Sequence, residues 1–251
     1  MKLTRELLSS LRIDEDDVGR FDRAFPEGMP VTKESIVEAL KGDMAHRIWD
    51  WVNKLGWNVS LIGVDLSGCT FKDGIDLRGA YLKDANLEKS VILFGKFSGA
   101  NLSGANLTGS IISKSDFSHA CLGGATIDKA EAQNTDFVGA NLSGVTARGA
   151  DFSESNFFNA DLCKGRFSYS DFSGADLREA TIINTSFINA DFLEADLRGV
   201  TFINTKLTGA NFTGANIEKA TFTNTSLEGV EFTDTSLEGT ILPLGEVKNN
   251  K

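Results

Sequence analysis

Carboxylates are the commonest side chains in this chain that could take part in chemistry, with 35 Asp and Glu residues against 25 Lys and Arg. A pair of carboxylates can act as general acid and base, but only where a cleft sets their pKa values apart. Cys69, Cys121 and Cys163 are far apart without a CxxC motif, and they do not cluster with His46 or His119. We therefore predict that the protein is not an enzyme and has no catalytic, cofactor-binding or metal-binding residue.

The carboxylates belong to a five-residue repeat that must position them. A large apolar residue recurs at every fifth position from Leu77 to Leu242 without a break in phase, and only Ala132 and Ala147 are small there. The position two residues earlier is nearly always Ala, Ser, Thr, Val or Gly, and Asp or Asn often stands between the two. Self-similarity at so short a fixed period predicts a solenoid, in which each repeat packs on its neighbours.

The slots of the repeat predict which residues face inward. Side chains alternate along an extended segment, so the large residue and the small residue two positions before it share the inner face. A narrow interior takes one of each, and Tyr is avoided there because its hydroxyl has no partner, which fits 18 Phe against only 2 Tyr. Gly or Asn two positions after the large residue suits the positive φ of a type II turn.

The repeat extends upstream of Leu77 after one change of phase. Leu61, Leu66 and Phe71 keep the five-residue spacing, but the step from Phe71 to Leu77 is six residues. We therefore predict that one residue is inserted near Asp73.

The motif A-[DN]-[LF]-x-x resembles that of the pentapeptide-repeat family, and the segment ANLSGANLTG at 100–109 is especially similar. This resemblance covers about three quarters of the chain. It implies an all-β repeat solenoid, namely a right-handed quadrilateral β-helix with four pentads per coil and about nine coils. A second period of twenty residues supports four pentads per coil independently, because one set of phenylalanines recurs at that interval: Phe152, Phe172, Phe192, Phe212 and Phe232.

The N-terminal region differs in composition and predicts α-helices. Thr4, Asp14 and Thr32 can cap helices that end near Leu11, Phe25 and Leu40, with Gly42 after the third. A fourth helix is expected from Asp43 to Leu55, ended by Gly56, with Ile48, Trp51, Val52 and Leu55 on one face.

These patterns divide the chain into three regions. We predict a helical cap or adaptor domain at 1–57, the pentapeptide-repeat β-helix at 58–244 and a flexible tail at 245–251. The face with Ile48 and Trp51 could cover the open end of the first coil, since a solenoid must protect its edges. A separate recognition or targeting module is the alternative for the same residues.

The composition excludes some classes of partner and indicates the cellular compartment. A net charge of −10 argues against direct binding of nucleic acid, which requires clustered Lys and Arg. No apolar run is long enough to span a membrane, and the first residues lack the apolar core of a signal peptide. Three isolated cysteines suggest reduced thiols in the cytoplasm.

Sorting the outward residues by the twenty-residue period gives two candidate partner-binding surfaces. The first, the acidic face, gathers carboxylates from successive coils: Asp151, Glu154, Asp171, Asp191, Glu194, Glu231 and Asp234. The second, the Thr/Ile face, sets outward Ile beside a column of Thr: Thr181, Ile183, Thr201, Ile203 and Thr221. Outward Ile is unusual on a solvated strand and suggests a contact surface.

Function is therefore expected on the outer surface of a filled rod. We predict a non-enzymatic scaffold that binds a protein partner, without a cofactor. Some members of the pentapeptide-repeat family mimic DNA and protect DNA gyrase or another topoisomerase from antibiotics or toxins, so the resemblance implies DNA mimicry as the alternative. The acidic face carries about half the charge density of duplex DNA if coils are spaced like ordinary strands.

Overall fold

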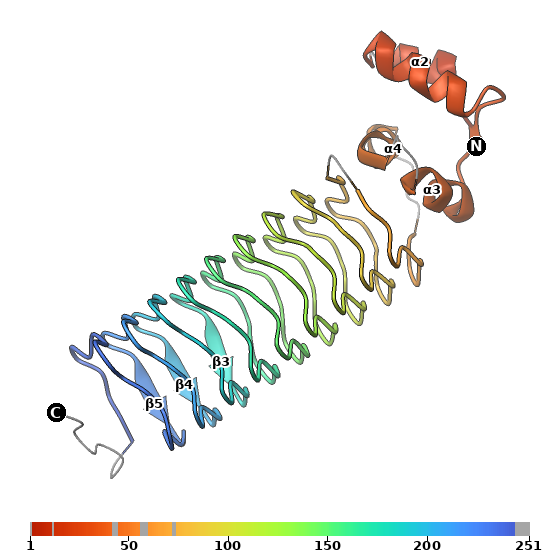
Figure 1. Ribbon diagram of the computed structural model, residues 1–251. Helices are drawn as coiled ribbons and strands as arrows, with labels where there is room; N and C mark the ends of the chain where they lie inside the picture. The colour runs from red at the N-terminus through yellow and green to blue at the C-terminus, as the bar shows by residue number, and fades with distance from the viewer. Residues whose placement is uncertain (1, 12, 42–44, 56–59, 72–73, 244–251) are drawn as a thin grey trace.

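The computed structural model describes residues 2–11, 13–41, 45–55, 60–71 and 74–243. A group of short helices lies at one end, and a long rod of stacked coils runs from it to the C-terminal end of the described chain (Figure 1). Before the rod come β1 (Lys2–Leu3), α1 (Arg5–Ser10), α2 (Glu15–Ala24), β2 (Met29–Pro30), α3 (Lys33–Leu40) and α4 (Ala45–Lys54). None of the helices among these residues is long and apolar enough to cross a bilayer.

The predicted helix starts are confirmed by capping hydrogen bonds. Thr4 accepts from the backbone N–H of Leu7, and Thr32 accepts from that of Ser35, so both side chains satisfy an N–H that has no partner within its helix. Asp14 likewise accepts from Asp16 N–H at 2.9 Å. The predicted positions of Gly42, Asp43 and Gly56 lie outside the described residues.

The helices share one apolar interior and lie against the start of the rod. Ile48, Trp51 and Val52 of α4 are buried, and the Trp51 ring meets the Phe21 ring of α2 edge-on at 6.0 Å between centroids. The face predicted to cover the first coil therefore packs on α2 through Trp51. On the other side, Lys33 at the start of α3 donates a hydrogen bond to the carbonyl of Ile62 in the first coil.

The rod is a parallel β-helix with a repeat of twenty residues. From Asp76 onward each outward residue bridges the residue twenty positions later, so four pentads make one coil, as the Phe spacing predicts. The earlier bridges, Asp65 with Asn86 and Thr70 with Val91, span twenty-one residues. The register change confirms one inserted residue between Thr70 and Asp76, while residue 73 itself lies outside the described residues.

Three strands on one side of the rod are long enough to form a regular sheet. They are β3 (Thr181–Ile183), β4 (Thr201–Ile203) and β5 (Thr221–Thr223), and they pair in parallel in the order β3-β4-β5. The pairing puts Thr201 between Thr181 and Thr221, and Ile203 beside Ile183. These strands lie side by side in the last third of the rod (Figure 1).

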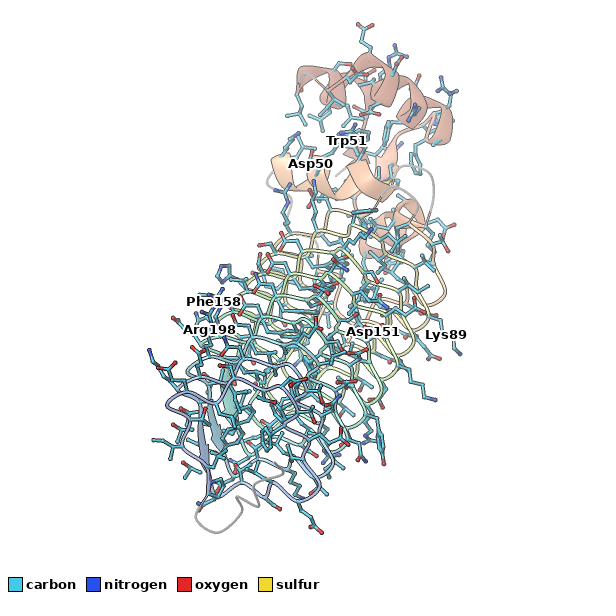
Figure 2. The ribbon with its side chains drawn as sticks, turned by 60° about the vertical axis from the view of Figure 1, so that its left-hand side comes forward. Asp50, Trp51, Lys89, Asp151, Phe158 and Arg198 are labelled. Carbon is cyan, nitrogen blue, oxygen red and sulfur yellow. The ribbon has the colours of Figure 1, made fainter. Side chains whose placement is uncertain are left out.

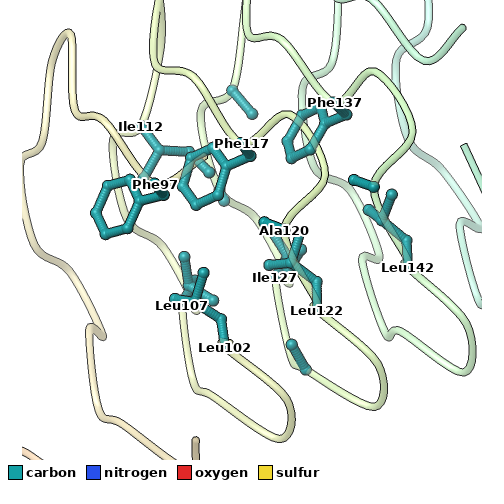
Figure 3. Packing of buried hydrophobic residues seen from close by; sticks show 14 of the residues in the cluster. Phe97, Leu102, Leu107, Ile112, Phe117, Ala120, Leu122, Ile127, Phe137 and Leu142 are labelled. Carbon is teal, nitrogen blue, oxygen red and sulfur yellow. The ribbon is translucent and has the colours of Figure 1, made fainter. Parts of the chain in front are cut away.

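The interior is filled by the two inward slots of every pentad. Large and small inward residues from Leu61 to Phe222 are buried, apart from the half-buried Cys69, which confirms the predicted orientation. The predicted phenylalanine ladder is present: centroids of Phe172, Phe192 and Phe212 are 5.3 and 4.8 Å apart, with nearly parallel rings. Figure 3 shows a second row of rings, from Phe97 through Phe117 to Phe137, beside a row of leucines. Stacked aromatic rings add to the free energy of burial.

The corners of the coils take the left-handed backbone conformation that a type II turn needs. Gly99 and Asn184 have φ of 66° and 56°, as the repeat predicts. Many other residue types occupy the same position, including Lys129 at 57° and Glu179 at 61°. A left-handed conformation costs a residue with a Cβ about 1–2 kcal/mol, so these corners are strained locally and held by the stacked coils around them.

Replacing Lys129 with Gly should therefore stabilise the rod. Relief of the left-handed strain outweighs the greater entropy of an unfolded glycine, and we expect a gain of about 0.5–1 kcal/mol in the free energy of unfolding. The matched control is Lys206→Gly, at an exposed bridge position without positive φ, which should lose about 0.5–1 kcal/mol. Urea unfolding of both variants measures the difference, and equal changes in the two would contradict this account of the corner.

Candidate partner-binding faces

The outward Asp and Asn residues of the repeat have a structural role that spacing alone does not show. Asp151 Oδ1 accepts from the backbone N–H of Ser153 at 2.9 Å, and Asp171 accepts from Ser173 N–H in the same way at 2.8 Å. This N–H points sideways at the corner and takes no part in the ladder between coils, so a short side chain two residues earlier satisfies it. The frequency of Asp and Asn in this slot follows from the turn, before any function is considered.

The acidic face is a column along one side of the rod that is interrupted at Asn211. Asp151 bridges Asp171, which bridges Asp191, and Asn211 separates this run from Glu231. These three aspartates are partly buried because their side chains bend back to the turn, while the remaining members are exposed at corners or on the last coil: Glu154, Glu194, Glu231 and Asp234. The structure thus brings all seven predicted residues to one side, and only four of them extend freely into solvent.

The neighbouring side of the rod carries less net charge than its aspartates suggest. Arg178 holds Asp176 with both carboxylate oxygens bonded, at 2.9 and 2.7 Å, and Arg198 holds Asp196 in the same way. Partial burial by itself would raise the pKa of Asp176, but the hydrogen bonds from Arg178 outweigh it and lower the pKa below its usual value. Phe158 and Arg198 lie on this side, and Asp151 lies apart from them (Figure 2).

Removing the charge of Asp176 should have an effect that depends on pH. The lowered pKa means that its stabilisation is present above the unfolded-state pKa of about 3.9 and is lost as pH falls through the folded-state pKa. Asp176→Asn keeps the acceptor for Arg178 N–H but loses the ion pair, so we expect a loss of at most about 1 kcal/mol at pH 7 and no loss near pH 2. Asp176→Ala also removes the turn acceptor and should stay destabilised at both pH values. Thermal unfolding of the wild type, Asp176→Asn and Asp176→Ala at both pH values measures these losses. A loss of stability in Asp176→Asn that does not change with pH would contradict the account.

The Thr/Ile face coincides with the three regular strands. Thr181 and Thr201 are exposed, Thr221 is half-buried, and Ile183 and Ile203 lie half-buried beside one another. At the adjoining corner Asn204 Nδ2 donates to Asn184 Oδ1 at 3.2 Å, so a side-chain hydrogen bond also links these two neighbouring coils. All five predicted residues therefore share one flat surface of threonine methyls, hydroxyls and isoleucine side chains.

The cysteines are not arranged for nucleophilic or metal chemistry within the described residues. Burial first, and then the neighbouring Asp161, raises the pKa of the Cys163 thiol to about 11, so it is protonated at neutral pH. Burial also raises the pKa of Cys69, and all three thiols are free. In the part of the chain that the structure describes, no three His, Cys, Asp or Glu side chains meet at a point where they could hold a metal ion.

Two open crevices lie at the helical end of the rod, near Asp50 and Trp51 of α4 (Figure 2). One lies between α2 and α4, and the other between α4 and the first coils, where Phe94 and Lys96 contribute to its wall. Neither the charge pattern nor the outward Ile residues of the sequence indicate that Leu93 and Phe94 are exposed beside the second crevice. The sequence does contain one indication of this exposure, because Phe94 stands at the corner position of the repeat, where Gly or Asn is favoured.

Solved structures resemble this rod over most of its length. A trypsin-treated form of QnrB1, a plasmid-mediated fluoroquinolone resistance protein, aligns with a TM-score of 0.60 and 22% identity, covering 72% of this chain and 91% of QnrB1. Full-length QnrB1 aligns with a TM-score of 0.53 and 22% identity, over 72% of this chain and 92% of QnrB1. HetL, a pentapeptide-repeat protein involved in heterocyst differentiation regulation in a Nostoc cyanobacterium, is 27% identical over 74% of this chain and 92% of its own, with a TM-score of 0.30.

These likenesses concern the fold, and no curated protein matches the sequence. The family model for pentapeptide repeats matches in 8 copies. The matched segments overlap and together run without a gap from 96 to 242: 96–128, 127–162, 155–192, 175–214 and 205–242. With more than half of its residues matched and with the bridges of a parallel β-helix along the rod, the chain belongs to the pentapeptide-repeat family.

Proposed function

We propose that the protein is a non-enzymatic scaffold that binds a protein partner on the outer faces of a rigid rod. The observation that carries this proposal is the Thr/Ile face, where three regular strands present Ile183 and Ile203 on a flat outer surface. The interior is filled with apolar side chains, so binding falls to the outside. Flat, partly apolar sheet surfaces of this kind are suited to contact with another protein.

The rest of the architecture enters the proposal as the means of presenting these faces. We take 58–244 as a right-handed quadrilateral rod of about nine coils, with 245–251 as a tail. Residues 1–57 act as its N-terminal cap, a role supported by the contact of Lys33 with Ile62 and by the continuous apolar core from the helices into the first coil. We place the protein in the cytoplasm because its three thiols are free.

Affinity capture from host lysate with matched variants tests the scaffold proposal. Ile183→Asp with Ile203→Asp puts charge on the Thr/Ile face without touching the interior, and we expect it to release the captured partner. The control reverses Glu154, Glu194 and Glu231 to Lys, all of them exposed carboxylates outside the Asp-to-backbone turns. Capture that both variants retain would overturn the assignment of this face.

DNA mimicry is the second candidate, and the column of carboxylates on the acidic face favours it. Regular carboxylates along one side resemble a phosphate backbone in sign, although at lower density. In that case the triple charge reversal should abolish inhibition of DNA supercoiling by purified gyrase, while the double Ile variant should still inhibit. Absence of any effect of the wild-type protein on supercoiling would exclude this candidate for gyrase.

A further inference from the structure

The column of the acidic face continues toward the N-terminus into a small apolar surface, since Asp151 bridges Glu131 and Glu131 bridges Ile111. Val91 bridges Ile111 on the next coil, and both side chains are half-buried on the outside. Leu93 and Phe94 follow on the same coil and are 37% and 58% exposed. We call Val91, Leu93, Phe94 and Ile111 the Phe94 patch.

Phe94 is held in a conformation that the fold does not require of a phenylalanine. Its φ of 58° is left-handed, where a bulky side chain is strained; the other left-handed corners of the described rod carry Gly or a residue with a polar group, Tyr169 among them. Most of its ring is exposed, so packing does not offset the strain. A wholly apolar ring that is exposed on a strained corner beside an exposed leucine is more readily explained by binding than by stability.

Two lysines adjoin the patch, in contrast to the carboxylates farther along this side, which begin with Glu131 on the coil after Ile111. Lys114 Nζ lies 5.7 Å from the centre of the Phe94 ring, and Lys96 lines the crevice next to it. The other charged groups in the crevice wall are already paired: Arg78 with Asp76, Arg47 with Asp17 and Asp50 with Lys54. Among the described residues neither Lys96, which lies between Asp76 and Asp116 in its bridge column, nor Lys114 forms an ion pair, so both cations can meet a carboxylate beside an apolar group.

We propose that the Phe94 patch and the adjacent crevice dock an extended segment of a partner protein in which an apolar side chain is flanked by carboxylates. The apolar side chain would pack on Leu93 and Phe94, and the carboxylates would meet Lys96 and Lys114. Aromatic anchors with a charged rim are the usual composition of such contact sites. The inference rests on the scaffold function proposed above and gives that scaffold a second surface with a defined partner chemistry.

Selection of random peptides on the immobilised full-length protein tests this docking site. Peptides retained by the wild type and rejected by Phe94→Gly should be enriched in a Leu, Phe or Trp with Asp or Glu on either side. Their affinity, measured by fluorescence anisotropy, should fall at least about tenfold in Phe94→Gly and in Lys96→Gln with Lys114→Gln. The matched control is Tyr169→Gly, another exposed aromatic residue at a left-handed corner, which should bind like the wild type.

Thermal unfolding separates a binding role from a structural one. Both Phe94→Gly and Tyr169→Gly relieve a left-handed side chain, so both should raise the unfolding temperature. A lower unfolding temperature in Phe94→Gly would show that the ring serves the fold and would overturn the inference. So would selected peptides without carboxylates, or self-association of the wild type that Phe94→Gly abolishes, because the occupant would then be a second copy of this chain.

The two proposals fail in different ways. Peptides that bind wild type and Phe94→Gly equally would overturn the docking site, while loss of the captured partner in the double Ile variant would still support the scaffold. The opposite result is that peptides bind at the Phe94 patch and the double Ile variant still captures the partner. That result would overturn the assignment of the Thr/Ile face and would leave the docking site supported.

Discussion

Phe192→Asp should destabilise the rod by several kcal/mol or prevent folding altogether. Phe192 is fully buried, and its ring stacks on Phe172 and Phe212 at 5.3 and 4.8 Å between centroids and meets Phe187 edge-on at 5.2 Å. Loss of a buried aromatic side chain alone costs about 3–5 kcal/mol. The carboxylate would in addition lie among apolar groups without a partner, which is unfavourable whether it is ionised or protonated.

The neighbouring residue provides a control for the added charge. Leu193 follows Phe192 directly but points outward and is 38% exposed, so Leu193→Asp should change the free energy of unfolding by less than about 0.5 kcal/mol. Urea unfolding followed by circular dichroism compares the two variants. A midpoint for Phe192→Asp close to that of the wild type would contradict the inward orientation of this slot and with it the ladder of rings.

Ser115→Ala is expected to be the second most damaging change, at about 2–5 kcal/mol, because one hydroxyl satisfies two buried backbone groups. Ser115 Oγ accepts from Gly95 N–H and donates to Ile92 C=O, both at 2.9 Å, across neighbouring coils. At most corners the carbonyl of the large residue accepts a hydrogen bond from the backbone N–H three residues later, and this bond closes the turn. Ala100 N–H donates to Phe97 C=O in this way. At Ile92 the hydroxyl takes the place of that bond, so its loss leaves a buried donor and a buried acceptor unsatisfied.

Ser90→Ala is the matched control, since Ser90 is buried in the same slot of a closed corner. Its hydroxyl donates to Leu87 C=O, but that carbonyl already accepts from Ser90 N–H at 3.1 Å. Removing the hydroxyl leaves no backbone group without a hydrogen bond, so we expect the free energy of unfolding to change by less than about 1 kcal/mol. Thermal or urea unfolding of the two variants decides the matter, and equal destabilisation would show that the bridging hydroxyl has no special role.

Much of this architecture follows from local pattern. The five-residue period specifies which side chains turn inward, since alternation along an extended chain leaves no other arrangement that buries Leu77 and its counterparts together. The recurrence of Phe at twenty residues predicts the length of a coil, and the six-residue step after Phe71 predicts the register change. Thr4, Asp14 and Thr32 mark the helix starts because a capping side chain acts within its own first turn. All of these are interactions between residues close in sequence or repeated at a fixed interval.

The tertiary structure decided what depends on contacts between coils and at the ends. The pattern treats Ser90 and Ser115 alike, yet of these two only Ser115 bridges neighbouring coils. It does so because Gly95 N–H bonds to the Ser115 hydroxyl and not to Ile92 C=O. It does not show that both carboxylate oxygens of Asp176 accept hydrogen bonds from Arg178. It likewise does not show that Trp51 packs on Phe21, or that Phe94 stands exposed beside a crevice formed by α4. A repeat determines position within a coil, whereas burial, pairing and strain depend on which residue lies in the next coil and on where the stack ends.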